Sequence, residues 1–393
     1  MSKTNRIALA AAIALWAAPP AQSFETDASH AVIMDYETGI VLFSKNGDEP
    51  MTPASMTKMM TVYMVFERLE DGRLNLDDEV LVSENAWRKG GAASGGSTMF
   101  LEPGSRVRIE DLLKGVMVVS GNDACIALAE HISGSEEAFA AEMTERAREL
   151  GLDTVNFKNA TGLYEEGHEV SAHDLAKLAS MTISNYPEYY AYYAIPEFKW
   201  YTIERPQGNR NPLLNSFEGA DGLKTGHLEA SGYALTGSAV IDGDRRIVVI
   251  NGADSKSERA RISERLMRAA FREFTVSEPV AAGTVIGQAP VWLGSSKTVG
   301  VSLKDDLVFG YEIAEKKNMT SEIVLTEALT APVKAGDIVG HLEISGPDGV
   351  IITRELVAAD SVSKVGLVEQ AFTGLGVLMN PPRTAETSAS SEQ

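Results

Sequence analysis

The order of the hydrophobic patterns along the chain predicts an α+β domain followed by a small all-β domain. The residues near the amino terminus and residues 222–253 have strand patterns, and a long run of helical patterns separates them. Strands from both ends of such a segment can join one antiparallel sheet, with the helices gathered beside it. After residue 275 only short alternating strands follow. We therefore expect two folded units in the 393 residues.

The elements of the first unit, residues 24–275, follow from local patterns. Apolar runs on either side of Glu37-Thr38-Gly39 predict a β-hairpin, and a helix is expected to begin at Ser55. Two β-rich runs flank the turn signal Asp242-Gly243-Asp244 and predict antiparallel pairing. Further helices are predicted, from apolar positions near a helical period, over 108–120, 121–133, 135–151, 171–184 and 257–274.

The second unit, residues 276–360, is expected to be a separate all-β domain without a catalytic constellation of its own. Its alternating segments predict strands over 298–303, 307–313, 321–328, 337–345 and 349–358. The last residues, 381–393, are polar and lack aromatic side chains, which predicts a disordered tail.

The first 23 residues have the layout of a secretory signal. Lys3 and Arg6 precede the apolar run 7–18, and the small residues Ala21 and Ser23 follow it. No later apolar run approaches the roughly 18 residues needed to span a bilayer. We therefore exclude residues 1–23 from the fold and expect an exported, periplasmic protein.

Charge and cysteine content exclude several classes of function. The formal net charge of −20 argues against a nucleic-acid partner, because phosphate binding needs clustered Lys and Arg. The single cysteine, Cys125, lies in an apolar helical run and is expected to be a buried thiol. The six histidines show no metal-site spacing, so we assign no metal.

Three short polar motifs stand beside apolar segments and can supply a reaction centre. Ser55 precedes Lys58 by three residues at a helix start, Ser120-Gly121-Asn122 lies between two predicted helices, and Lys224-Thr225-Gly226 lies in a predicted strand. Each motif has a structural explanation when taken alone: a helix cap, a surface lysine or a turn. The glycine of the third motif would let a substrate approach the backbone closely.

Together and in this order, the three motifs resemble the signature of the penicillin-recognising serine enzymes. The segments "PASMTKMMT", "SGNDA", "FKNATGL", "SAHDLA" and "DGLKTGH" are similar, more narrowly, to the exported D-alanyl-D-alanine carboxypeptidases, the low-molecular-mass penicillin-binding proteins. This resemblance implies a β-lactamase-like catalytic domain, an antiparallel sheet with a helical subdomain, before the all-β domain. It also implies a serine peptidase that acts on peptidoglycan stem peptides ending in D-Ala-D-Ala, needs no cofactor and is acylated by β-lactams.

The residue types fit acyl transfer through a serine. Lys58, three residues after Ser55, can hold its amine near the hydroxyl and take its proton when desolvated beside another cation, which Lys224 would supply. By the resemblance, Ser120 relays a proton and Asn122 orients Lys58 and the substrate amide. The unpaired backbone N–H groups of Ser55 and His227 are candidates for an oxyanion hole.

The resemblance also assigns groups that bind the substrate's terminal carboxylate. These are Thr225 and an arginine, either Arg259 or Arg261, of which Arg259 is the first choice. Gly226 and His227 complete the strand that lines the substrate. Asp174 and Ser97 are further positions near the expected site, and both stay outside the catalytic set.

Residues 361–380 suggest an amphipathic helix with apolar positions on one side. Related carboxypeptidases often end in such a helix on the outer face of the inner membrane, but Lys364 is the only basic residue here and three glycines weaken the helix. Contact with the membrane surface and docking on the protein's own β domain both remain open.

Three alternatives to a carboxypeptidase share these motifs. A β-lactamase must deacylate penicillin quickly, yet the chain has no E-x-x-L-N segment of the kind that holds the deacylating water in class A enzymes. A transpeptidase or endopeptidase would use the same residues with a different acceptor or substrate. A weakly active peptidoglycan-binding scaffold would depend on the β domain instead.

Overall fold

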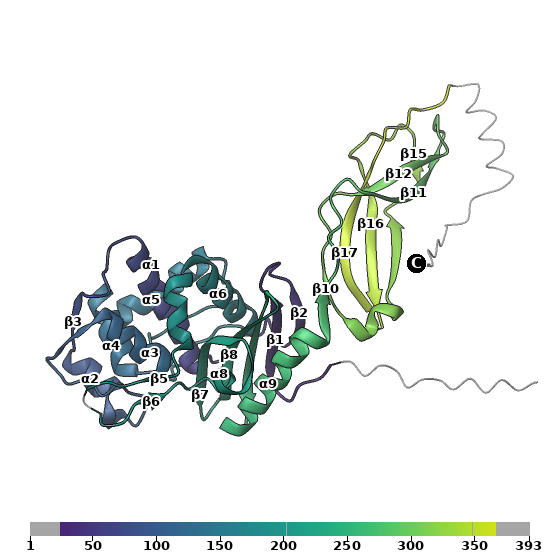
Figure 1. The fold of residues 1–393 in the computed structure, drawn as a ribbon. Coiled ribbons are helices and arrows are strands. Elements are labelled where there is room, and N and C mark those ends of the chain that lie inside the picture. The colour runs from purple at the N-terminus through teal and green to yellow at the C-terminus, as the bar shows by residue number, and fades with distance from the viewer. Residues whose placement is uncertain (1–23, 202, 348, 367–393) are drawn as a thin grey trace, which may run out of the picture.

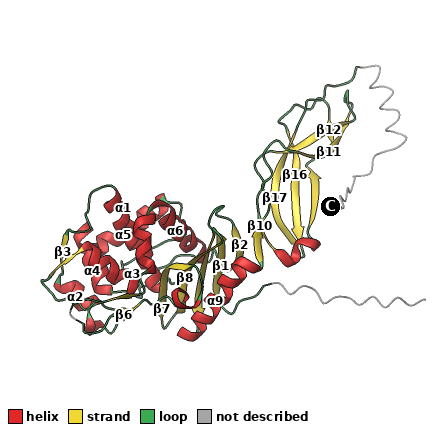
Figure 2. Cartoon of the chain, in the orientation of Figure 1, coloured by secondary structure: helices red, strands yellow, loops and turns green. Residues whose placement is uncertain are grey.

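The computed structural model describes residues 24–201, 203–347 and 349–366 and arranges them in two units (Figure 1). The larger unit contains most of the helices and a five-stranded sheet, and the smaller unit consists mainly of strands (Figure 2). Helix α9 (Lys256–Arg272) ends beside the smaller unit. The predicted fold class, an α+β domain followed by a small all-β domain, is confirmed.

The central sheet has the order β2-β1-β9-β8-β7, and every neighbouring pair is antiparallel. Its strands are β1 (His30–Asp35), β2 (Val41–Lys45), β7 (Ala220–Leu228), β8 (Gly232–Ile241) and β9 (Asp244–Ala253). The predicted β8–β9 turn is confirmed: Asp242 and Gly243 have φ of 54° and 95°, as a two-residue hairpin loop requires. Strands from both ends of the larger unit meet in this sheet, and β7 forms one edge.

Side chains of the sheet alternate between two hydrophobic cores. Ile247 and Val249 belong to the core shared with the helical body, whereas Val248 and Ile250 pack with Leu266 of α9. Each fully buried aliphatic side chain contributes roughly 1.5–3 kcal/mol by leaving water. The sheet is therefore a middle layer fixed on both faces, which makes it a firm support for groups at its edge.

The main helices of the body match the predicted ranges to within a few residues. They are α1 (Lys58–Glu70), α3 (Ile109–Val118), α4 (Asn122–Ser133), α5 (Glu136–Glu149) and α6 (Ala172–Asn185). Serine side chains cap α5, α6 and α9, but neither α1 nor α4 has a side-chain cap. Helix α3 lacks a side-chain cap as well, and α1 and α4 begin at the first two motifs.

Several short elements were not predicted, because they are too brief for a hydrophobic period to appear. They are α2 (Glu84–Gly90), α7 (Pro187–Tyr190), α8 (Leu213–Ser216), β3 (Glu79–Leu81), β4 (Arg106–Arg108), β5 (Glu197–Phe198), β6 (Gln207–Gly208), η1 (Ala54–Thr57), η2 (Ala92–Ser94) and η3 (Ala191–Ala194).

The smaller unit is built on a sheet of order β14-β16-β17-β12-β11-β15. Its strands are β11 (Val285–Trp292), β12 (Thr298–Leu303), β14 (Thr320–Leu325), β15 (Leu329–Thr330), β16 (Ile338–Gly346) and β17 (Gly349–Ala358). A ribbon of β10 (Phe274–Val276) and β13 (Gly310–Glu312) lies beside β2, and η4 (Ile313–Asn318) follows it. Of the predicted strands, only the one over 307–313 is much shorter than expected. Strands β10, β11 and β15 were missed.

Some predictions fall outside the described residues. These are the signal at 1–23, the tail at 381–393 and most of the segment 361–380. Residues 361–366 are described and are not helical, since Val362 and Lys364 form isolated β-bridges with Val333 and Gly294. Within the described ranges, no helix has both the length and the apolar character needed to cross a membrane.

Candidate active site

Ser55 and Lys58 lie together at the start of the first long helix. Ser55 is in the 3-10 turn η1, and its Oγ accepts a hydrogen bond of 3.0 Å from Nζ of Lys58, the first residue of α1. The Ser55 side chain caps neither element, and Lys58 is fully buried. The structural explanations, a cap and a surface lysine, are therefore wrong for this pair.

The Lys58 amine has a second partner that the sequence did not reveal. Its Nζ donates to the backbone carbonyl of Thr161 at 2.6 Å, from a loop more than a hundred residues away. Burial lowers the pKa of Lys58 to about 8, because the charged form loses its hydration. A substantial fraction of this amine is then neutral in mildly alkaline solution, as a proton acceptor for Ser55 must be.

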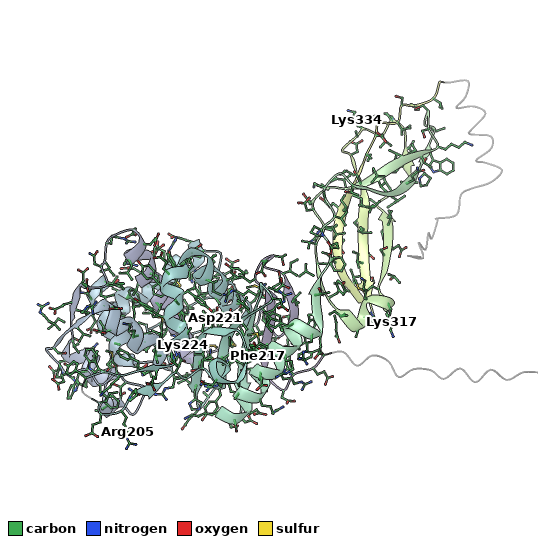
Figure 3. The ribbon with its side chains drawn as sticks, in the orientation of Figure 1. Arg205, Phe217, Asp221, Lys224, Lys317 and Lys334 are labelled. Carbon is green, nitrogen blue, oxygen red and sulfur yellow. The ribbon has the colours of Figure 1, made fainter. Side chains whose placement is uncertain are left out.

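Ser120 and Lys224 form a second serine–lysine pair. Ser120 stands between α3 and α4 with φ of 63°, and its Oγ accepts a hydrogen bond of 2.9 Å from Lys224 Nζ. Lys224 lies in the interior of the larger unit, whereas Lys317 and Lys334 lie on the smaller one (Figure 3). The fold thus joins the second and third motifs directly.

Burial is the largest cause of the lowered pKa of both lysines. Burial, and then repulsion from Lys58, Arg210 and Arg259, holds the pKa of Lys224 well below its usual range. Burial lowers the pKa of Lys58, and the effect of a Lys224 cation on it stays a prediction. Within the described residues, neither lysine has an ion-paired carboxylate.

Asn122, the first residue of α4, is buried and lies two residues after Ser120. Its backbone N–H donates to the carbonyl of Ser97 at 2.9 Å, which places the Ser97 loop next to the second motif. Its Oδ1 has no hydrogen-bond partner among the described residues. Among the described residues Lys58 and Asn122 therefore share no hydrogen bond, and Asn122 Oδ1 is a buried acceptor without a partner.

Thr225, Gly226 and His227 follow Lys224 along the edge strand β7. A Cβ at Gly226 would lie 2.8 Å from the carbonyl oxygen of Pro53, the residue before η1. This close approach favours glycine at position 226. His227 is exposed, and its ring stacks on Tyr233 at 3.9 Å. Beside His227, a cavity of about 620 Å³ is also lined by Thr52, Glu229 and Asp254.

Arg259 and Arg261 have different surroundings on α9. Arg261 is exposed and paired with Asp27 at 2.9 Å and Glu258 at 3.2 Å. Arg259 is buried over the ring of Tyr233, with its Nε unpartnered among the described residues, and burial lowers its pKa only to about 10. It therefore keeps its charge at neutral pH without an acidic partner, which favours Arg259 over Arg261 for binding a carboxylate.

Arg210 is a further cation that the sequence did not single out. Arg259 donates to its carbonyl at 3.3 Å, and its charge contributes to lowering the pKa of both Lys224 and Arg259. Its loop has no periodic pattern and no recognised motif, so only the fold brings it to the site.

Asp174 and Cys125 have structural contacts. Asp174 is buried and accepts from the backbone and the hydroxyl of Thr154 at 2.8 and 2.6 Å. Cys125 is buried, donates to the carbonyl of Ala160 at 2.9 Å, and has its pKa raised to about 11 by burial. A thiol of that pKa is not a nucleophile at neutral pH.

The chain is similar to known proteins over both of its units. A family model for D-alanyl-D-alanine carboxypeptidases matches residues 16–255, and a model for the C-terminal domain of penicillin-binding protein 5 matches residues 274–364. The chain belongs to the D-alanyl-D-alanine carboxypeptidase family. It is a serine peptidase, and the family predicted from the three motifs is confirmed.

Individual relatives agree with this assignment. This carboxypeptidase is 38% identical over 344 residues to D-alanyl-D-alanine carboxypeptidase DacC of Escherichia coli (strain K12), in an alignment covering 86% of this chain and 85% of that protein. The crystal structure of DacD from Francisella tularensis is similar with a TM-score of 0.72 and 32% identity, covering 88% of this chain and 96% of that one. Penicillin-binding protein D2 from Listeria monocytogenes, in its ampicillin-bound form, has a TM-score of 0.55 and 27% identity, covering 64% of this chain and 100% of that one.

Proposed function

We propose that Ser55 is the nucleophile with which this carboxypeptidase removes the terminal D-alanine from peptidoglycan stem pentapeptides. The observation that supports this most directly is the 3.0 Å contact between Ser55 Oγ and the buried Lys58 amine. Neutral Lys58 takes the hydroxyl proton as Ser55 attacks the carbonyl carbon of the D-Ala-D-Ala bond. The C–N bond then breaks, D-alanine leaves as an amine, and the peptide remains esterified to Ser55.

The second pair serves the leaving group. The proton that Lys58 took passes through the Ser120 hydroxyl to the departing nitrogen, and Lys224 donates to that hydroxyl at 2.9 Å. The unpaired Asn122 Oδ1 accepts from the substrate amide. Water then attacks the ester carbonyl, and Ser55 is released with the tetrapeptide as a free acid.

Backbone and cationic groups hold the substrate's charges. The N–H groups of Ser55 and His227 stabilise the oxyanion. Thr225 and Arg259 hold the terminal carboxylate. Gly226, which follows Thr225, lies close to Pro53 at the start of η1, the turn that carries Ser55. An arriving carboxylate also favours the charged form of Lys224, whose pKa is lowered by burial and by neighbouring cations.

β-Lactams are expected to acylate Ser55 in the same way and to leave slowly. They carry a carboxylate and a reactive carbonyl, which the groups above would bind. The structural relative from Listeria monocytogenes was solved in ampicillin- and cefotaxime-bound forms, which supports this extension.

We assign residues 1–23 to an export signal, residues 24–275 to the catalytic domain and residues 276–360 to the C-terminal β domain. The protein then acts in the periplasm, with residues 361–380 as the candidate contact with the outer face of the inner membrane. The acidic chain is not expected to bind nucleic acid.

Mass spectrometry of products tests the proposed reaction. A stem pentapeptide ending in D-Ala-D-Ala is incubated with residues 24–393, intact and as Ser55→Ala, with an acceptor amine present. Tetrapeptide and free D-alanine, formed only by the intact protein, are expected. A cross-linked product would instead indicate a transpeptidase. If folded, intact protein leaves the pentapeptide unchanged, the result would contradict the proposed reaction and favour a peptidoglycan-binding scaffold.

A further inference from the structure

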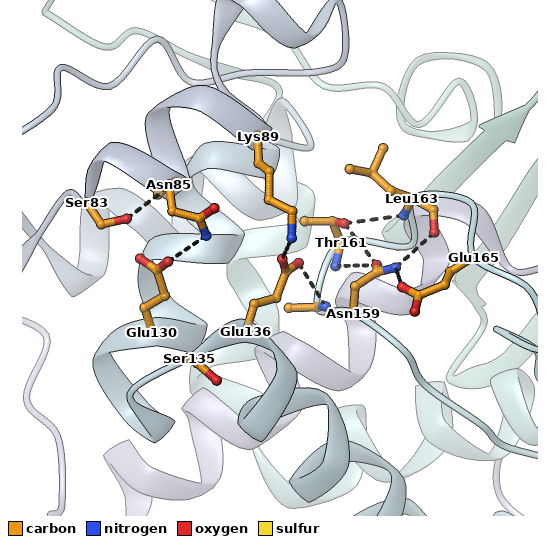
Figure 4. Close-up of polar contacts among 12 residues, drawn as sticks. Ser83, Asn85, Lys89, Glu130, Ser135, Glu136, Asn159, Thr161, Leu163 and Glu165 are labelled. Carbon is orange, nitrogen blue, oxygen red and sulfur yellow. Dashed lines mark hydrogen bonds and ion pairs between the residues drawn. The ribbon is translucent and has the colours of Figure 1, made fainter.

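The carbonyl that holds Lys58 belongs to a short loop organised by one buried side chain (Figure 4). Asn159 Oδ1 accepts from the backbone N–H of Thr161 at 3.2 Å, from the Thr161 hydroxyl at 3.0 Å and from the N–H of Gly162 at 2.8 Å. The Asn159 amide donates to the carbonyl of Leu163 at 3.0 Å. The peptide units on both sides of the Thr161 α-carbon are therefore tied to one side chain.

The residue before Thr161 is anchored independently. The N–H of Ala160 donates to Glu136 Oε1 at 3.4 Å, and Lys89 of α2 pairs with the other oxygen of this carboxylate at 2.8 Å. The Ala160 carbonyl accepts from the hydroxyl of Thr61 on α1 at 2.8 Å. Because Ala160 is held in place by α1 and α5, the Asn159 contacts determine mainly the direction of the next carbonyl, that of Thr161.

The loop also packs tightly on η1, the turn that carries Ser55. Gly162 has φ of 78°, and a Cβ at this position would lie 1.8 Å from the carbonyl oxygen of Ala54, the residue before Ser55. A shift of this loop would therefore disturb both the position of Ser55 and the 2.6 Å contact between Thr161 and Lys58.

We propose that Asn159 is a positioning residue for the reaction, which fixes the Thr161 carbonyl so that the Lys58 amine points at Ser55 Oγ. This proposal rests on the proposed function, in which Lys58 is the base. Misplacing a catalytic group by about 1 Å can cost about 100-fold in rate. Loss of Asn159 is therefore expected to slow acylation more than it weakens binding.

The charges around Lys58 allow a second test of the role of Asn159, through the pH dependence of the acylation rate. Glu136 and Asp123 favour its charged form, the Cys125 thiol faces it, and Lys224 and His168 are the neighbouring basic groups. An aspartate at position 159 would keep the three acceptor contacts, lose the donor contacts to the Leu163 carbonyl at 3.0 Å and to Glu165 at 3.4 Å, and add a negative charge to this environment. That charge would raise the pKa of Lys58 and shift the rise of the acylation rate to higher pH.

Stopped-flow acylation by a fluorescent penicillin separates the two effects, because it gives the acylation rate constant k2 and the dissociation constant Kd of the preceding complex. For Asn159→Ala we expect k2 to fall about 30- to 100-fold with Kd within about threefold of the parent. The matched control is Asn156→Ala, which loses one amide–carbonyl hydrogen bond of 2.7 Å to Gly167 in the same loop region. Its k2 and Kd should stay within about twofold.

The variant Asn159→Asp keeps the acceptor contacts but loses the donor contacts to Leu163 and Glu165, so its maximal k2 should recover in part, to within about tenfold of the parent. The rise of its k2 with pH should lie at higher pH than in the parent. Folded Asn159→Ala protein with parental k2, or an equal loss in Asn156→Ala, would overturn the proposal. If Asn159→Ala does not fold, Asn159→Asp decides: a loss of more than about tenfold at every pH would overturn the proposal.

The parent and Lys58→Ala distinguish failure of this proposal from failure of the proposed function. If the parent is not acylated, or if Lys58→Ala is acylated normally, the proposed function fails. If both behave as expected and Asn159→Ala matches the parent, only the role of Asn159 fails.

Discussion

The catalytic domain and the C-terminal β domain place their polar side chains differently. The catalytic domain buries Lys58, Lys224 and Arg259 without ion-paired carboxylates among the described residues. In the described part of the chain after residue 276, the only buried polar side chain is that of Ser302. The cation Lys304 of this domain is exposed and paired with the equally exposed Glu355.

This difference separates folding from catalysis. A buried charge without a partner costs stability, whereas an exposed ion pair contributes little either way. The described part of the β domain does not contain the first arrangement. In the catalytic domain it occurs where the proposed reaction needs an amine of lowered pKa and a free guanidinium.

The largest effect is expected for Lys58→Ala. Without the base, acylation of Ser55 by penicillin should fall by about 10⁴-fold or more, while the protein stays folded because a buried unpaired charge has been removed. Acylation kinetics and circular dichroism measure the two properties. The control is Lys114→Ala, which removes a partly buried ion pair with Glu110 and a cation–π contact with Tyr192. Normal acylation by folded Lys58→Ala protein would show that Lys58 is not the base.

A smaller effect is expected from the arginines of α9. Arg259→Ala should raise the KM for a D-Ala-D-Ala peptide about 10- to 100-fold, because the terminal carboxylate loses a charge-assisted partner. Arg261→Ala, which removes only exposed pairs with Asp27 and Glu258, should leave KM within about twofold. Steady-state kinetics on both variants test the assignment, and the reverse ranking would transfer the carboxylate site to Arg261.

The pH dependence of acylation tests the buried amine directly. The pKa of Lys58 is lowered to about 8, so its neutral form is scarce at pH 6 and grows about tenfold per pH unit toward that value. The acylation rate should rise accordingly and level off above about pH 8. A rate that is flat between pH 6 and 8 would exclude titration of Lys58 as the limiting step.

The smallest effect is expected in the β domain. Lys304→Ala removes an exposed ion pair at the sheet surface, so neither kcat/KM nor Tm should change by more than experimental error. Calorimetry and product assays on the full chain provide the measurement. A clear loss of activity would mean that the two domains are coupled, contrary to the separation described above.

Most of the fold could be predicted because its main elements are long and periodic. Helices α3 to α6 and the β8–β9 hairpin follow from apolar spacing and from one turn signal. Strand β11 was missed, since it contains Pro290 and Gly287, which weaken a strand pattern. The pairing of β10 with β13 joins segments more than thirty residues apart, and no local pattern specifies it.

The site could be predicted only where a side chain's type reveals its chemistry. Ser55, Lys58, Ser120 and Lys224 have recognisable spacings, and the structure brings each serine to a lysine. The Thr161 carbonyl could not be found, because every residue has a carbonyl and only the tertiary fold selects this one. Asn159 and Arg210 were missed for the same reason: their neighbours are set by loops.

Two residues at the site have backbone conformations that side chains disfavour. The described chain has six non-glycine residues with positive φ, and two of them are Ala54, next to Ser55, and Ser120. Each such residue costs of order 1 kcal/mol or more. Selection for thermostability alone would therefore favour glycine at these positions and would relax the two turns that present the serines. Heat tolerance gained in this way would trade against turnover, so stabilising substitutions are better sought in the β domain.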